Sequence, residues 1–255
     1  MNFKYTIEHN QVTITKYTGT SKDITIPNEI EDLPVTTIGQ RVFSGNELTS
    51  ISLPQNLTTI EHSAFINNNL TSISLPQNCT TIEHSAFIHN NLTSISFPQN
   101  CTTIGKYAFQ NNELTSIDLP QNLTTIEQGA FYCNRLKSIS LPQNCTTIGQ
   151  WAFWNNRLTS ITLPQNCTTI KEYAFSHNNL TSISLPNTFR TEEHIQNIFD
   201  FSLEEFENRN KKFIKPYLAK ILEDYVHHHF YDIIIDYMMI PSNELIQEVM
   251  ETYKN

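Results

Sequence analysis

A repeat of 22 residues runs through most of the chain and limits its possible folds more than any other feature. We call the residues at equivalent positions of successive units a column. Three columns hold the same residue at every 22nd position: leucine from Leu48 to Leu180, isoleucine from Ile51 to Ile183 and proline from Pro54 to Pro186. The consensus unit reads L-T-S-I-S-L-P-Q-N-[LC]-T-T-I-x-x-x-A-F-x-x-N-x. No single unit can bury its own apolar face, so neighbouring units must stack and share one core. The repeat therefore predicts a solenoid.

Each column of the unit has a physical reason. In the segment TSISL, apolar residues alternate with serines, which is the period of a half-buried strand, and Pro54 ends the pairing. A second extended piece should point Leu57 and Ile60 inward, and Phe65 should fill the remaining corner. With a diverged unit at residues 24–43, we expect eight TSISL strands in a parallel sheet roughly 34 Å long.

Two further columns carry polar or reactive side chains. The asparagines should point inward and satisfy turn backbone groups as a ladder; they are Asn46, Asn68, Asn90, Asn112, Asn134, Asn156 and Asn178. Four of the five cysteines replace leucine in the column of Leu57 and Leu123, at Cys79, Cys101, Cys145 and Cys167. We interpret them as buried free thiols and not as a disulfide framework.

The column pattern resembles the BspA-like leucine-rich repeats of bacteria, also called the Treponema pallidum type. The lead-in resembles that family too, with Val12 and Ile14, then Ile24-Thr-Ile26-Pro27, then Leu33-Pro-Val35. The resemblance covers residues 3 to about 188. It implies a right-handed leucine-rich-repeat solenoid, or horseshoe, of short parallel strands that binds proteins, often in adhesion or host contact. It implies no catalytic residues.

The sequence divides into three parts. Residues 1–23 are expected to form a β-hairpin cap, and residues 24–188 the repeat domain. Residues 189–255 should form a small all-α domain of about four helices, docked at least partly on the last repeat. Thr191 suits a helix N-cap, and Ser202 with Glu205 has the spacing of a capping box.

Specificity should lie in the variable columns on the turn and convex side of the repeats. Large residues gather there in the middle and later repeats, and we name them the aromatic edge: Tyr107, Tyr132, Arg135, Trp151, Trp154, Arg157 and Tyr173. Aromatic and arginine side chains are common interface anchors. The alternative is that the rings only pack along the coil edge. The serine-rich strand face is a second candidate surface, with Asp118 and Lys137 as its charged residues.

Composition excludes some classes of partner. The net charge is −9, with −3 in residues 1–188 and −6 in residues 189–255, so nucleic acid is not an expected partner. No apolar run is long enough to insert in a membrane. We see no signal peptide, so the expected location is the cytoplasm, or outside the cell by a non-classical or effector route. Repeated Asn-x-Thr sequons favour a bacterial or cytosolic protein over a eukaryotic ectodomain.

The helical part offers one further constellation. Asp224, His228, Asp232 and Asp236 follow i,i+4 steps and could hold a divalent cation, but a solvated helix face is the preferred interpretation. We predict no metal and no cofactor, and no catalytic motif is present. The sequence therefore predicts a non-catalytic protein-binding scaffold. Two alternatives stay open, which are a secreted effector engaging host proteins and an enzyme using His228, Asp224 and Asp232.

Overall fold

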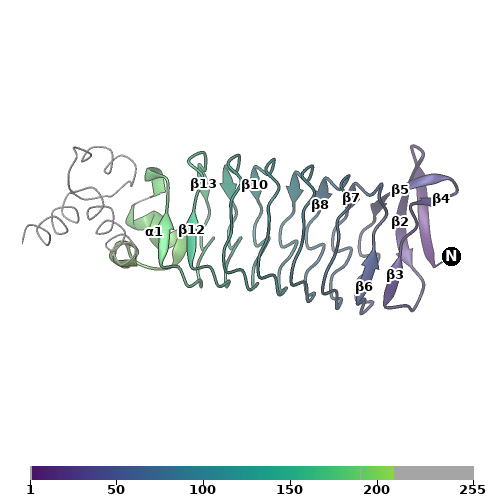
Figure 1. Ribbon diagram of the computed structural model, residues 1–255, viewed down its shortest axis with the longest axis horizontal. Helices are drawn as coiled ribbons and strands as arrows, with labels where there is room; N and C mark the ends of the chain where they lie inside the picture. Colours follow the sequence, from purple (N-terminus) through teal and green to yellow (C-terminus); the bar gives the residue numbers. More distant parts are fainter. Residues whose placement is uncertain (1, 190, 210–255) are drawn as a thin grey trace, which may run out of the picture.

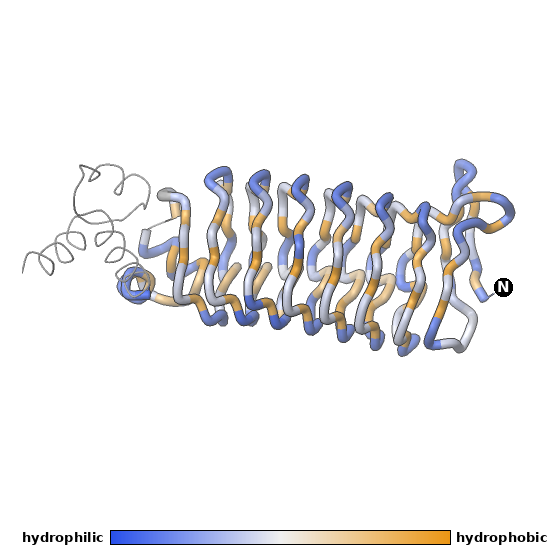
Figure 2. Tube along the Cα trace, viewed as in Figure 1, coloured by the Kyte–Doolittle hydropathy of each residue, from blue (hydrophilic) through white to orange (hydrophobic). Residues whose placement is uncertain are grey.

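The computed structural model describes residues 2–189 and 191–209. These residues form an elongated stack in which successive coils lie side by side along one axis (Figure 1). Apolar positions recur at matching places of each coil, and the turns at both margins are hydrophilic (Figure 2). The predicted solenoid with 22-residue spacing is confirmed.

The stack begins with a hairpin of β1 (Phe3–Glu8) and β2 (Gln11–Tyr17). His9 and Asn10 form its two-residue turn, and both have positive φ values, of 52° and 60°, as a type I′ turn requires. Three short strands follow, β3 (Asp23–Thr25), β4 (Glu29–Ile30) and β5 (Leu33–Ile38). β2 pairs in parallel with β5, so the predicted hairpin is the first element of the stack.

The most regular pairing lies on the side of the coils that carries the Thr-Thr-Ile segments, here called the Thr–Ile side. Its strands are β7 (Thr59–Ile60), β8 (Thr81–Ile82), β9 (Thr103–Ile104), β10 (Thr125–Ile126), β11 (Thr147–Ile148) and β13 (Thr169–Ile170). One sheet has the order β1-β2-β5-β7-β8-β9, with β4 beside β5, and a second has the order β10-β11-β13. The Thr–Ile side, which we expected only to be extended, is thus the main parallel sheet.

Pairing on the TSISL side is less continuous than predicted. β6 (Ser50–Ser52) pairs with β3, and β12 (Ser160–Thr162) pairs with β14 (Ser182–Ser184). Between them, Ser74, Ser96 and Asp118 make only isolated bridges. The expected single sheet of eight strands is therefore wrong. The physical reason is that hydrogen bonds between coils are spread around the whole perimeter, including the turns, so no one side must pair without a break.

The core is built from stacked columns. The rings from Phe43 to Phe175 lie parallel within 7°, with neighbouring centroids 5.1 to 5.7 Å apart. The widest spacing, 5.7 Å, separates Phe109 from Phe131, where Phe97 lies perpendicular to both rings with centroids 5.5 and 6.4 Å away. The main sheet divides between β9 and β10, in the same two coils. A phenylalanine in place of the usual leucine thus coincides with the break in strand pairing.

The asparagine ladder is confirmed. Asn112, which is buried, donates from Nδ2 to the carbonyl oxygens of Phe87 and Phe109 at 2.9 and 3.2 Å. Its Oδ1 accepts from the backbone N–H of Leu92 at 3.1 Å. The same bonds recur from Asn68 to Asn178, so each of these asparagines satisfies turn groups of two coils. Asn46 departs from the prediction, because it donates to the carbonyl of Ser44 in its own turn.

A helix closes the other end of the stack. After η1 (Asn187–Phe189), α1 (Glu192–Phe199) begins at its N-cap, Thr191, whose hydroxyl accepts from the N–H of His194. The chain is helical again over residues 203–209, where the hydroxyl of Ser202 accepts from the N–H of Glu205. Both predicted N-cap hydroxyls therefore accept from the first turn of their helix, and the carboxylate of Glu205 bonds to Arg209. The rest of the predicted helical domain, residues 210–255, lies outside the described residues.

Candidate functional site: the aromatic edge

The backbone conformation of the turns sets the directions in which side chains of the aromatic edge point. Tyr107, Trp151 and Tyr173 occupy one column and have φ values of 58°, 58° and 57°. This left-handed conformation is uncommon for residues with a side chain, and it is held here by hydrogen bonds between coils. Trp151, for example, donates its N–H to the carbonyl of Glu172 in the next coil at 3.2 Å.

Tyr107 packs flat against its own stack. Gly129 is its counterpart in the next coil, and a Cβ built there would lie 2.3 Å from two carbons of the Tyr107 ring. The tyrosine ring therefore occupies the space that a side chain at Gly129 would need. On its other side Tyr107 lies edge-on to His84, with centroids 5.9 Å apart, and His84 lies 4.9 Å from His62. Burial, then the charges of His62 and Lys106, lower the pKa of His84.

A second ladder of rings runs over the later coils. Tyr132 and Trp154 stack in parallel, 4.6 Å apart at 8°, and His177 meets Trp154 edge-on at 4.7 Å. Tyr132 and Trp154 are half-buried. Burial, then the neighbouring Cys133, raise the pKa of Tyr132. His177 was not among the predicted residues. It lies in a variable column of the coil after Trp154, and that position could have indicated it.

Trp151 and Tyr173 stand apart from both ladders. Within residues 2–189 and 191–209, neither ring makes an aromatic contact. Tyr173 is 38% exposed, and only Ile7 accompanies it among the exposed large apolar side chains of the described chain. Its backbone N–H donates to the carbonyl of Asn197 in α1. Tyr173 thus ends the edge where the helix begins.

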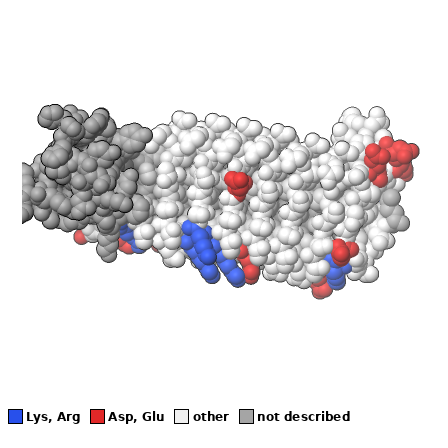
Figure 3. Space-filling model, viewed as in Figure 1, with Lys and Arg blue, Asp and Glu red and all other residues white. Residues whose placement is uncertain are grey.

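The two arginines of the edge differ in their partners. Arg135 forms an ion pair with Glu113 of the preceding coil, with Nη2 and Oε1 2.7 Å apart. Arg157 lies one coil further on, is exposed, and has no ion pair with any described residue. Lys137 is also exposed, two residues beyond Arg135. Basic side chains gather over the middle coils on a face that otherwise carries few charges (Figure 3).

The predicted edge is therefore not one continuous aromatic patch. Tyr107 belongs to the histidine ladder of the earlier coils. Tyr132 and Trp154 form the later ladder, with Arg135 and Arg157 each three residues beyond a ring of the same coil. Tyr107, Tyr132 and Trp154 pack against neighbouring rings along the coils.

The sequence also suggested a column of cysteines and a possible metal site. The column cysteines are buried free thiols, as predicted, and burial raises the pKa of Cys79 to about 12 and that of Cys101 to about 11. Among the described residues, no three His, Cys, Asp or Glu side chains could share a metal ion. Asp224, His228, Asp232 and Asp236 lie outside them. No helix in the described part of the chain is long and apolar enough to cross a membrane.

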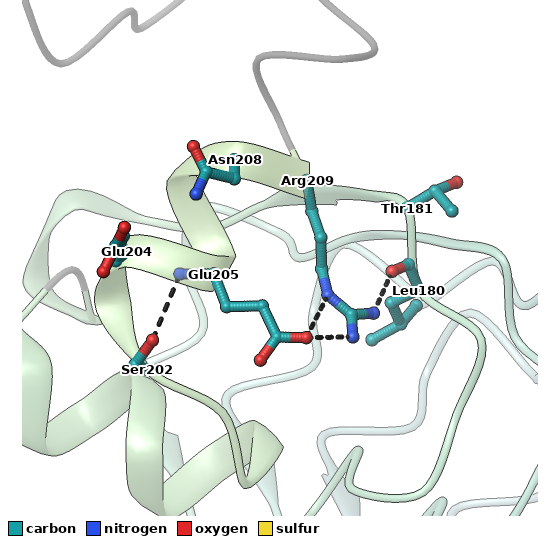
Figure 4. Close-up of a pocket in the computed structure, with 7 residues that line it drawn as sticks. All are labelled: Leu180, Thr181, Ser202, Glu204, Glu205, Asn208 and Arg209. Carbon is teal, nitrogen blue, oxygen red and sulfur yellow. Dashed lines mark hydrogen bonds and ion pairs between the residues drawn. The ribbon is translucent and has the colours of Figure 1, made fainter.

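A hollow at the C-terminal end of the stack has polar side chains that bond to one another. Arg209 reaches across it to the carbonyl of Leu180 and to the carboxylate of Glu205 (Figure 4). Its guanidinium lies 4.6 Å from the ring centre of Phe201. The hydroxyl of Ser202 is occupied by the N–H of Glu205. These groups attach the helical segment to the last coil, and they form no nucleophile and base pair.

Comparison with known proteins gives a consistent result. The family model for the BspA type leucine rich repeat region matches residues 14–132 and 102–217, with six copies. No curated protein matches the chain. Among solved structures, the leucine rich repeat protein of T. pallidum is 26% identical, with a TM-score of 0.51, covering 73% of this chain and 81% of that chain.

A second solved structure is a leucine rich cell surface protein from Faecalibacterium prausnitzii A2-165. It is 20% identical, with a TM-score of 0.48, covering 72% of this chain and 75% of that chain. The family model spans well over half of the chain, and its match includes every residue of the aromatic edge. The chain therefore belongs to the BspA type leucine-rich-repeat family.

Proposed function

We propose that this chain is a non-catalytic scaffold that binds a protein partner along the later part of the aromatic edge. The observation that carries this proposal is the stacked pair Tyr132 and Trp154, with Arg157 nearby and without an ion pair among the described residues. Leucine-rich-repeat families typically serve as binding scaffolds, which supports the class of function.

The physical basis is rigid presentation. Rings already held by their neighbours lose little conformational entropy when a partner covers them. The exposed rims of Tyr132 and Trp154 can bury further apolar area, and Arg157 can form a bidentate hydrogen-bonded pair with a carboxylate. Lys137 adds a second cation close to Arg135. The expected partner therefore presents an apolar side chain close to an acidic one.

The test is capture of a partner from bacterial and host lysates by the purified full chain. A Trp154→Ser/Arg157→Ala variant removes the proposed anchors, and a Ser94→Arg/Ser138→Arg variant obstructs the serine face instead. All three proteins must first show the same thermal unfolding.

The proposal predicts a partner that is held by the wild type and the serine-face variant and lost by the anchor variant. A partner held by the anchor variant and lost by the serine-face variant would move the binding site to the strand face. Turnover of a captured protein by the wild type would contradict a purely non-catalytic role.

A further inference from the structure

Among the described residues, β1 has one edge that pairs with no strand. It is the terminal strand of its sheet, and its one described partner is β2. It is six residues long and lies at the end of the stack (Figure 1). An exposed edge strand presents a row of backbone N–H and C=O groups that can pair with another strand.

The hairpin turn fixes which backbone groups point outward. Glu8 and Gln11 flank a two-residue turn, so they exchange both backbone hydrogen bonds, and alternation then directs the groups of Thr6 towards Thr13. The backbone groups of Tyr5 and Ile7 must therefore face away from β2. Ile7 is also 41% exposed, the highest value among large apolar side chains in the described part of the chain.

These outward groups limit how a second β1 strand can add. In a symmetric antiparallel pair, residues with outward backbone groups must lie opposite each other. The register that places Tyr5 opposite Ile7 also places Thr6 opposite Thr6. The same register places Lys4 opposite Glu8 twice, once on each side of the twofold axis. The neighbouring registers, Tyr5 opposite Tyr5 or Ile7 opposite Ile7, lose both charge pairs.

Charge complementarity therefore selects one register. Lys4 lies directly opposite Lys16 of β2, and like charges in this position are unfavourable. Lys4, Lys16 and Glu8 form no ion pair with any described residue. Glu8 of a second copy would place a carboxylate beside Lys4 and offset that repulsion.

We propose that β1 is a self-complementary pairing edge, through which two copies of this chain join antiparallel about a twofold axis at Thr6. The pairing extends the sheet of β1, β2 and β5 across both molecules. It uses a surface separate from Tyr132 and Trp154, so it stands independently of the proposed function. A twofold pair of scaffolds would present two aromatic edges to a partner.

The first test measures molar mass by light scattering, from micromolar to millimolar concentration of the full chain. Lys4→Glu should raise the Kd of self-association about tenfold, because it replaces two opposite-charge pairs by two repulsive ones. The charge-swapped Lys4→Glu/Glu8→Lys variant restores both pairs and should recover the wild-type Kd. Both positions are exposed, so the fold is unaffected.

The second test reports the register directly, in a Cys133→Ser background. Thr6 lies opposite its own copy in a non-hydrogen-bonded pair, about 4.5 Å between Cα atoms, so Thr6→Cys should form an intermolecular disulfide under mild oxidation with oxidised glutathione. Lys4→Cys is the matched control and should not, because Lys4 lies opposite Glu8. A monomer at every concentration, a swap that fails to rescue, or equal cross-linking at both positions would overturn the proposal.

Discussion

Both ends of the stack have a terminal coil whose apolar face must be covered, and they cover it with different secondary structure. At the N-terminal end, Phe3 and Tyr17 of the hairpin cover the ring of Phe43, with centroids 6.3 and 5.5 Å away. At the C-terminal end, Phe199 of α1 covers Phe175 at 5.9 Å. Both ends thus cover the last ring of the phenylalanine column with an aromatic side chain.

The two ends differ in how they satisfy the backbone N–H and C=O groups of the terminal coils. On the Thr–Ile side each coil donates N–H groups to the coil before it, and β2 supplies the missing acceptor through the carbonyl of Ile14, which Gly39 reaches at 2.8 Å. On the phenylalanine side each coil donates to the coil after it. There Ile198 of α1 accepts from Phe175 at 3.1 Å, using a last-turn carbonyl that has no partner within the helix.

This difference has a consequence for assembly. A helix satisfies most of its own backbone groups, so α1 completes the hydrogen bonds of the last coil and offers few groups for continuation. A strand satisfies half of its groups with one neighbour, so β1 completes the first coil and creates a new edge. The comparison predicts that association occurs at the N-terminal end and not at the helix.

The largest expected effects come from removing the terminal rings. Phe43→Ala and Phe199→Ala should each lower the free energy of unfolding by about 3–5 kcal/mol, because each leaves a cavity against a stacked ring. Urea denaturation measures the loss. Alkylation of thiols in native buffer then shows which end opens: Phe199→Ala should expose Cys167 before Cys79. Equal rates for the two thiols would mean that the ends do not open separately.

The asparagine ladder should matter more inside the stack than at its end. Asn112→Ala should cost about 2–3 kcal/mol, because it leaves buried backbone groups unpaired. Asn178→Ala should cost about 1 kcal/mol, since Asn178 is half-buried and water can replace part of its bonding. Asn179→Ala is the control, because Asn179 is exposed and its backbone is outside the left-handed region. Thermal unfolding of the three variants gives the order, and a larger loss at Asn178 would contradict it.

The helix cap can be weakened by itself. Thr191→Ala removes the hydroxyl that accepts from the N–H of His194 and should cost about 1 kcal/mol. Thr191→Ser retains the hydroxyl and should be close to neutral. Hydrogen exchange should speed up in α1 and at Phe175, with no change in β1 or β2. Faster exchange at both ends would show that the two caps are coupled.

The smallest effect at neutral pH is expected in the thiol column. Cys79→Leu should change stability by less than about 1 kcal/mol at neutral pH, because Leu57 and Leu123 occupy the same column in other coils. At alkaline pH the two proteins should diverge. Burial raises the pKa of Cys79 to about 12, so the thiol stays protonated when folded, whereas it ionises near pH 9 when unfolded.

The sign of this pH dependence follows from the raised pKa. The contribution of Cys79 is complete below about pH 9 and is lost as the pH rises towards about 12. The wild type should therefore lose stability over that range faster than Cys79→Leu. Denaturation at a series of pH values measures the difference, and parallel curves would contradict a buried thiol at this position.

Much of the fold could be predicted from the sequence because stacking forces each column into a single environment. The buried phenylalanines, the inward asparagines, the buried thiols and the caps at Thr191 and Ser202 all follow from one repeat and simple capping rules. The choice of the Thr–Ile side as the main sheet does not follow, because Thr-Thr-Ile and Ser-Ile-Ser have similar strand propensity.

The candidate site was less predictable, because it depends on contacts between coils. Tyr107 and Tyr132 are both variable turn residues in the sequence, yet Gly129 lets the first lie flat on its neighbour while the second stacks on Trp154. Glu113 pairs with Arg135 and leaves Arg157 without an ion pair among the described residues. The contacts of these side chains depend on the residues that lie about 22 positions away, in the neighbouring coils. The three-dimensional structure shows how those residues pack.

The most direct test of the contrast between the two ends is amide hydrogen exchange at a concentration where the protein is monomeric. The structure predicts that the N–H groups of Tyr173 and Phe175 are protected by the carbonyls of α1. It predicts fast exchange at Tyr5 and Ile7 on the open edge of β1. Protection of Tyr5 and Ile7 in the monomer, or fast exchange at Phe175, would contradict an N-terminal end that is open to pairing and a C-terminal end that is closed.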